Sequence, residues 1–208
     1  MANVSRPRGL SPVGTLTGAA YNEQGSLYAI ASDASNTYAI GDVVSLATTG
    51  SDASGIAYVT KMTADSGMPL GVIVGVRPAD PGVSLQGTNI DLSKLYLSLS
   101  SGTRYVYVIT DPNVVYEVQA DTYALADVGK NVGMNYTADQ TSTLSQSAPQ
   151  SSTTAKASTV IALGTTGSLA LPLTVLGFAQ RQDNAAGAYA KILVALNKQA
   201  YKQAVGTA

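Results

Sequence analysis

The sequence predicts an all-β protein, built as a sandwich or barrel of roughly ten short strands. Its short apolar runs are separated by Gly, Pro, Asn and Asp, the residues that favour turns. Two of these runs, Ile56–Met62 and Arg104–Thr110, alternate with the period of a strand, and the second places two tyrosines on one face and two valines on the other. With 208 residues, 45% of them hydrophobic, the chain can form one all-β domain or two small ones with a sizeable core.

The expected strands follow one another with few helical segments between them. In chain order they are Leu27–Ala31, Val43–Ala47, Ile56–Met62, Leu70–Val76, Lys94–Leu99, Arg104–Thr110, Val114–Gln119, Thr159–Leu163, Leu173–Ala179 and Tyr189–Leu196. Turn residues at 40–42, 79–82 and 110–113 support this division. Thr122–Val128 is expected to form a short helical turn ended by Gly129. One helix over Ala188–Val205 is the alternative to the last strand, and the alternating β-branched Ile192 and Val194 favour the strand.

Three segments differ in composition from the expected β domain, residues 21–196. Residues 1–20 contain prolines at 7 and 12 and glycines at 9, 14 and 18, which predicts an extended N-terminal arm. In residues 137–159, 12 of 23 are Ser or Thr, typical of a low-complexity surface loop. Residues 197–208 are expected to form a C-terminal tail.

The composition argues against an enzyme. The chain has no His and no Cys, which removes the usual side chain for proton transfer near neutral pH and most ligands of zinc and iron. It also lacks a phosphate-binding loop, a dinucleotide turn, a nucleophile elbow and a calcium loop. We therefore expect no catalytic residues, no metal and no cofactor. A glycosidase-type carboxylate pair among Asp111, Glu117 and Asp121 stays open, although a turn explains Asp111 and a strand face explains Glu117.

Charge is distributed unevenly along the chain, whose net charge is -1. Arg6 and Arg8 lie near the start and Lys191, Lys198 and Lys202 near the end, whereas all 13 acids lie between. The basic ends either dock on an acidic partner surface or simply solvate the termini. The chain shows no dense Lys/Arg patch, no signal-peptide segment and no apolar run long enough for a bilayer, so we expect no nucleic acid, no membrane and synthesis in a cytoplasm.

Tyrosine is strongly preferred over the other aromatic residues, with 12 Tyr against one Phe and no Trp. Tyr96, Tyr105, Tyr107 and Tyr116 fall in neighbouring expected strands and are predicted to form one aromatic face. Such a face packs within one subunit, contacts a second subunit or contacts carbohydrate, and the residues leave these three alternatives open.

Five segments, taken in order, resemble the head decoration or cement proteins of tailed bacteriophages. They are Asn3–Gly14, Gly41–Leu46, Pro69–Val76, Tyr105–Gln119 and Leu176–Val194. The resemblance implies a protein on the outer surface of the virion that binds the major capsid protein of an icosahedral head, as a homotrimer, and stabilises the shell.

On this interpretation the extended arm is the capsid-binding element. Its expected contacts are Arg6, Pro7, Arg8, Leu10 and Val13. Deleting residues 1–16 is then expected to leave a folded domain that no longer binds heads.

Two other functional classes remain open for this chain. One is a virion adhesin or fibre-associated module that touches host glycans, and the other is a glycan hydrolase.

Overall fold

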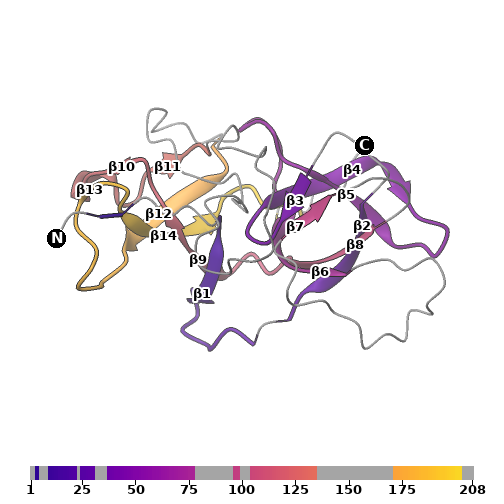
Figure 1. Ribbon diagram of the computed structural model, residues 1–208, viewed down its shortest axis with the longest axis horizontal. Coiled ribbons are helices and arrows are strands. Elements are labelled where there is room, and N and C mark those ends of the chain that lie inside the picture. The colour runs from indigo at the N-terminus through magenta and orange to yellow at the C-terminus, as the bar shows by residue number, and fades with distance from the viewer. Residues whose placement is uncertain are drawn as a thin grey trace.

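The computed structural model describes residues 3–4, 9–22, 24–30, 37–77, 96–98, 104–134 and 171–202. In this part of the chain there are 14 strands and one short 3-10 turn, so the all-β class is confirmed. The strands form two main bodies, a closed barrel and an open sheet, which lie side by side in Figure 1.

The barrel closes through five strands in the order β2-β5-β4-β6-β8. Their bounds are β2 Ser26–Ile30, β4 Val43–Ser51, β5 Ala57–Lys61, β6 Gly71–Arg77 and β8 Arg104–Ile109. β2 pairs with β5 in parallel and with β8 antiparallel, and these two pairings close the ring. The alternating valines of β8, Val106 and Val108, are fully buried with Ile30, Val44 and Val59 in one apolar cluster.

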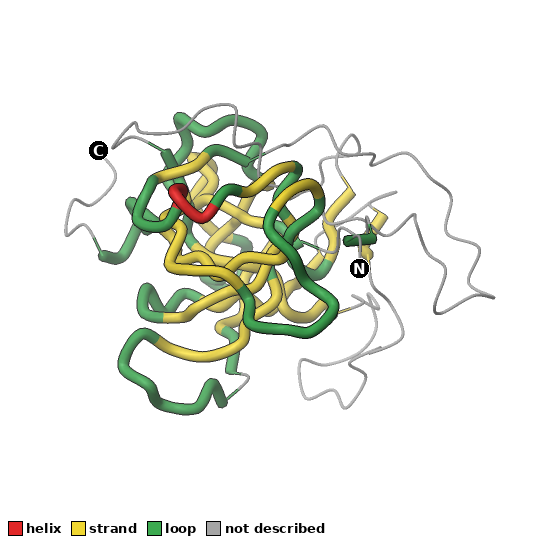
Figure 2. Tube along the Cα trace, turned by 90° about the vertical axis from the view of Figure 1, so that its left-hand side faces the viewer, coloured by secondary structure: helices red, strands yellow, loops and turns green. Residues whose placement is uncertain are grey.

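The open sheet has the order β1-β9-β14-β12-β11, and all of its pairs are antiparallel. Its strands are β1 Ser11–Thr15, β9 Val114–Gln119, β11 Asn131–Val132, β12 Leu173–Phe178 and β14 Lys191–Leu196. Two short pairs complete the fold: β3 Thr37–Ala39 with β7 Tyr96–Ser98, and β10 Thr122–Tyr123 with β13 Gly187–Ala188. The 3-10 turn, η1, spans Leu125–Asp127 and is the red segment in Figure 2.

Barrel and sheet share a core, because the second apolar cluster draws residues from both. Val43, Met62 and Val72 of the barrel region pack in the same cluster as Tyr116 and Ile192 of the sheet. The chain passes directly from β8 to β9 through a turn at 110–113, in which Asp111 Oδ1 accepts a hydrogen bond from the Asn113 N–H. The two bodies therefore form one continuous hydrophobic unit.

The C-terminal end of the described chain is fixed to the barrel by a buried amide. Gln199 Nε2 donates to the carbonyl oxygens of Leu70 and Thr110, and its Oε1 accepts from the N–H groups of Tyr201 and Lys202. Every hydrogen-bonding direction of this side chain is used, which offsets the cost of burying it completely.

Most of the expected elements are present. Nine expected strands coincide with β2, β4, β5, β6, β7, β8, β9, β12 and β14; the tenth, Thr159–Leu163, lies outside the described residues, as do the expected loop at 137–159 and the turn at 79–82. Strand β14 confirms the preference for a strand over a helix at Lys191–Leu196. The helical turn expected over Thr122–Val128 is shorter than predicted: Leu125–Asp127 form a 3-10 turn, whereas Thr122–Tyr123 form strand β10. Gly129, the expected end of the turn, has a φ of 82°. Residues 11–15 of the expected arm instead form strand β1.

Candidate functional site

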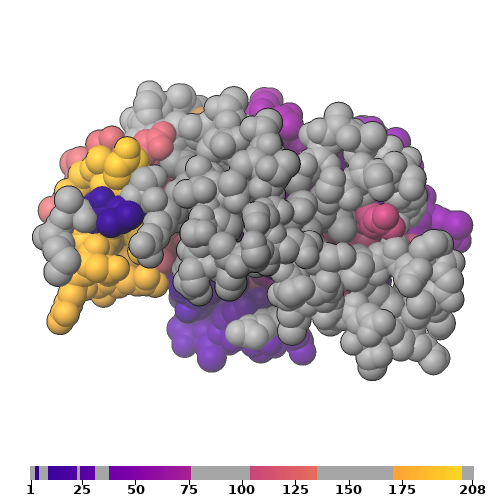
Figure 3. All heavy atoms as spheres, viewed as in Figure 1, coloured from indigo at the N-terminus to yellow at the C-terminus, as the bar shows by residue number. Residues whose placement is uncertain are grey.

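The N-terminal segment is anchored to the protein on both sides of residues 5–8. The Asn3 side-chain amide donates to the carbonyl oxygens of Ala185 (2.7 Å) and Ala188 (2.8 Å), and Asn3 Oδ1 accepts from the Ala185 N–H (2.9 Å). Figure 3 shows residues 3–4, in indigo, lying against the yellow and orange atoms of the C-terminal part of the chain. Further on, the Leu10 N–H donates to the Gly41 carbonyl oxygen at 2.9 Å. Asn3 and Leu10 are thus both fixed to the body of the protein.

The expected capsid contacts have different positions. Arg6, Pro7 and Arg8 lie outside the described residues. Leu10 is 1% exposed and belongs to the core shared by barrel and sheet. The prediction that Leu10 contacts the capsid is therefore wrong. Burial of a leucine side chain contributes about 2 kcal/mol, which favours keeping it inside. Val13, at 48% exposure, does face solvent.

The outer edge of β1 is poorly suited to pairing with a further strand. Pro12 has no backbone N–H to donate, and the register with β9 shifts between Pro12 and Gly14, which marks a bulge. The Thr15 carbonyl oxygen already accepts from the Gly18 N–H. Proline and bulges are features that protect edge strands from unwanted pairing. What β1 offers to a partner is therefore side chains, with Val13 and the neighbouring Leu16 about half exposed.

The predicted aromatic face is not formed by its four tyrosines together. Tyr105 and Tyr107 lie half-buried on the barrel strand β8, and the Tyr105 hydroxyl donates to Asp52 Oδ2 at 2.8 Å. Tyr116 instead lies in β9 of the open sheet, is fully buried, and belongs to the shared core. This burial raises the pKa of Tyr116. Tyr96 is placed only by its backbone, opposite Ala39. Assigning Tyr116 to an intersubunit face is therefore wrong.

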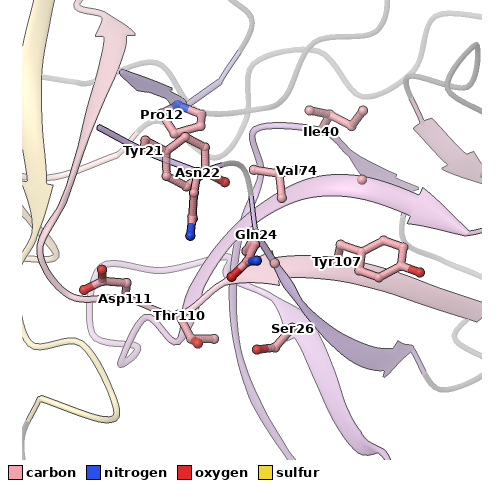
Figure 4. A pocket seen from close by; sticks show the side chains of 12 residues that line it. Pro12, Tyr21, Asn22, Gln24, Ser26, Ile40, Val74, Tyr107, Thr110 and Asp111 are labelled. Atoms are coloured by element: carbon pink, nitrogen blue, oxygen red, sulfur yellow. The ribbon is translucent and has the colours of Figure 1, made fainter. Parts of the chain in front are cut away.

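An open cavity of about 950 Å³ lies where β1 and the chain leading into β2 approach the barrel. Figure 4 shows the amides of Asn22 and Gln24, the hydroxyl of Thr110 and the carboxylate of Asp111 around this space. The lining consists of Pro12, Tyr21, Asn22, Gln24, Gly25, Ser26, Ile40, Val74, Gly75, Tyr107, Thr110 and Asp111. Such a lining offers neutral donors and acceptors together with aromatic surface, and it contains no cation.

Two of the three carboxylates considered for catalysis, those of Asp111 and Glu117, have structural partners. Asp111 holds the turn between β8 and β9, as described above. Glu117 is 5% exposed, and its Oε2 lies 2.6 Å from the Arg181 guanidinium. The Asp121 backbone carbonyl accepts from the Tyr189 N–H across the β10–β13 pair. These structural roles explain why Asp111 and Glu117 are present without assigning them a catalytic step.

Among the described residues no group of three or more acids could hold a metal ion, and no described helix is long and apolar enough to cross a membrane.

The sequence interpretation did not include a second exposed surface, at the end of the molecule that carries β10 and β13. Leu125, Val128 and Tyr189 lie there and are 67%, 49% and 42% exposed. No periodic pattern marks them, because they lie in a 3-10 turn and beside a two-residue strand.

Comparison of the chain with protein-family models, curated proteins and solved structures finds no match.

Proposed function

We propose that this protein is a structural virion protein that binds the outside of an icosahedral phage head and stabilises the capsid lattice as a decoration protein. The observation that carries the proposal is the ordered set of five motifs, which coincide with the framework of the fold. They cover β1, the start of β4, β6, the β8–β9 unit, and the stretch from β12 to β14. A resemblance spread over both bodies favours a shared architecture over one short coincidental match.

The N-terminal segment supports a contact role in a form different from a free arm. Asn3 and Leu10, which lie on either side of Arg6 and Arg8 in the sequence, are both held on the body. Residues that are already held before binding lose less conformational entropy on docking. Two guanidinium groups suit an acidic partner surface, since they form bidentate hydrogen bonds with carboxylates.

Stabilisation of the shell follows from repetition. A trimer that engages several capsid subunits gains effective concentration, so contacts that are weak singly hold strongly together. Binding to the assembled lattice in preference to free subunits stabilises the assembled state by mass action. The protein then acts as a clamp across capsomer seams, with no chemical step.

The proposal is tested by co-sedimentation of the purified protein with expanded heads that lack it, across a range of protein concentrations and salt. We expect saturable binding and greater survival of decorated heads on heating. Arg6→Ala/Arg8→Ala should weaken binding and reduce its salt dependence. The matched control Lys198→Ala/Lys202→Ala removes the same charge from the other basic end of the chain. Heads that sediment without the wild-type protein would contradict the proposal.

A second candidate function is a virion adhesin that contacts host glycans. The cavity in Figure 4 favours it, because planar amides, hydroxyls and a carboxylate are groups that hydrogen-bond sugar hydroxyls, and Tyr107 supplies a half-buried aromatic ring. A glycan screen with the isolated protein separates the two functions. Binding that is lost in Asn22→Ala/Gln24→Ala, without head binding, would favour the adhesin.

A further inference from the structure

The cavity shown in Figure 4 is bounded by parts of both bodies of the protein. Pro12 belongs to β1 of the open sheet, whereas Val74 and Tyr107 belong to the barrel strands β6 and β8. Asp111 lies in the turn that joins the two bodies. The volume of about 950 Å³ is at the upper end of the range of small-molecule sites, and the cavity is open to solvent. A ligand can therefore enter a space that the fold already provides.

Two glycines fix the barrel side of this cavity. A Cβ atom at Gly25 would lie only 3.2 Å from Tyr107 Cβ, from the Val108 nitrogen and from Val74 Cγ2. A Cβ atom at Gly75 would lie 3.3 Å from Tyr107 Cδ2. Because both positions lack a side chain, the chain that enters β2 approaches β6 and β8 closely, and the Tyr107 ring packs against β6. This wall is formed before a ligand binds, which reduces the entropy lost on binding.

The lining is divided into an apolar side and a polar side. In Figure 4, Pro12, Ile40 and Val74 lie along the upper side of the space, whereas Gln24 and Asp111 lie below it. Val74 also packs against the apolar core that barrel and sheet share, so the apolar side continues into the interior. A ligand that fills this space needs an apolar face as well as groups that form hydrogen bonds.

The polar side offers groups that the fold does not use. The side chains of Asn22, Gln24 and Ser26 are exposed, and within the described part of the chain they form no hydrogen bond. Asp111 Oδ1 accepts from the Asn113 N–H, which leaves Oδ2 to accept from a ligand. Amides and hydroxyls both donate and accept. The polar side can therefore pair with several hydroxyl groups of a ligand at once.

Charge and polarity together select the class of ligand. The 12 described residues that line the cavity include one carboxylate, that of Asp111, and no Lys or Arg. Phosphate groups and nucleic acids are bound chiefly through Lys and Arg, so this lining does not suit them. A wholly apolar ligand would leave the amides without partners on binding. A neutral hexose has hydroxyl groups around its ring, an apolar C–H face and no charge, and it matches both sides of the cavity.

We propose that this cavity binds one neutral hexose unit of a glycan and that Asp111 excludes acidic sugars. The hydroxyls of the sugar pair with the amides of Asn22 and Gln24, and its C–H face lies on the side of Pro12 and Val74. The inference rests on the second candidate function, glycan binding, and is independent of binding to phage heads. Two like charges about 4 Å apart lower affinity about fivefold even at the dielectric constant of water. Asp111 should therefore weaken the binding of a uronic acid at least about fivefold relative to the matching hexose.

The test is a saturation-transfer NMR titration of the full-length protein with matched pairs of sugars. The pairs are glucose with glucuronic acid, galactose with galacturonic acid, and mannose with mannuronic acid. We expect at least one hexose to bind, at least about fivefold more tightly than its uronic acid. Each hexose is also supplied within a disaccharide, so tighter binding of the disaccharide assigns the site to a glycan chain and equal binding to a single sugar.

Two double variants locate the site. Asn22→Ala/Gln24→Ala should weaken hexose binding about tenfold or more, since each lost hydrogen bond costs a few-fold in affinity. Gln180→Ala/Gln182→Ala is the matched control, because it removes two exposed amides that do not line the cavity, and it should bind the hexose like wild type. Unchanged thermal melting shows that each variant is folded.

Asp111→Asn separates the charge of this residue from its role in the turn. Asparagine keeps an oxygen that accepts from the Asn113 N–H and removes the negative charge. We expect the preference of this variant for a hexose over its uronic acid to fall below that of wild type.

Each result has a distinct meaning. Absence of binding by every neutral hexose overturns this inference together with the glycan candidate, and leaves the decoration function, which is measured on heads, standing. Hexose binding that Asn22→Ala/Gln24→Ala does not weaken overturns the assignment to this cavity. Equal binding of a hexose and its uronic acid by wild type, or an unchanged preference in Asp111→Asn, overturns the role of Asp111.

Discussion

Truncation of Leu10 to alanine tests whether the N-terminal segment is part of the fold. Leu10 is 1% exposed and packs in the core shared by barrel and sheet, and its N–H donates to the Gly41 carbonyl oxygen. Leu→Ala in a packed core loses the transfer free energy and leaves a cavity, so we expect the free energy of unfolding to fall by about 3 kcal/mol. For a chain of this size that lowers Tm by roughly 6 to 12 °C.

The assay is thermal and urea unfolding at equal protein concentration, with Val13→Ala as the matched control. Val13 is 48% exposed in the next strand, and its truncation should change stability by no more than about 0.5 kcal/mol. The same argument corrects the expectation for deletion of residues 1–16, because that deletion removes Leu10 and β1 and should destabilise the domain itself. A Leu10→Ala protein that unfolds like wild type would refute the reasoning.

Two further predictions concern charged groups. Lys61 Nζ lies 2.7 Å from Asp42 Oδ2, and the two side chains are only 6% and 0% exposed. Lys61→Met should therefore lower the free energy of unfolding in urea by about 3–5 kcal/mol, because it leaves a buried carboxylate without its cation. The double variant Lys61→Met/Asp42→Asn should recover much of this loss, and additive effects of the two substitutions on the free energy of unfolding would argue against the pair. The hydrogen bond from Lys130 lowers the pKa of Asp127, so this contact stabilises the fold above the unfolded pKa near 4 and is lost as pH falls through the lower folded pKa. Asp127→Asn should therefore melt below wild type at pH 7 and converge with it near pH 2, and a Tm difference that does not depend on pH would count against this assignment.

Local sequence patterns predicted nine of the 14 strands in the described part of the chain, but not the assignment of the strands to two bodies. The alternating Tyr and Val residues of β8 and the apolar run of β9 are visible in the sequence. The turn at 110–113, however, sends β8 into the barrel and β9 into the open sheet, where β9 pairs with β1 and β14. These partners are distant in sequence, so no local pattern reveals that Tyr116 is buried in the core rather than beside Tyr107 on a surface.

Strand β1 was missed for a different reason. Pro12 and Gly14 are poor strand residues, and they are acceptable here only because β1 lies at an edge and contains a bulge. The buried Asp42–Lys61 pair was also out of reach, since an isolated Lys or Asp in a sequence is ordinarily exposed and only tertiary contact brings these two together. Of the predicted capsid contacts, Val13 has the exposure that the role needs, and Leu10 does not.

The central claim is tested most directly by counting the bound copies of this protein on expanded heads that lack it. The account predicts saturation at a copy number commensurate with the icosahedral lattice, in multiples of three if trimers bind, together with heads that withstand heating better. A handful of copies per particle, or none, would contradict it and assign the protein to another part of the virion or to another function.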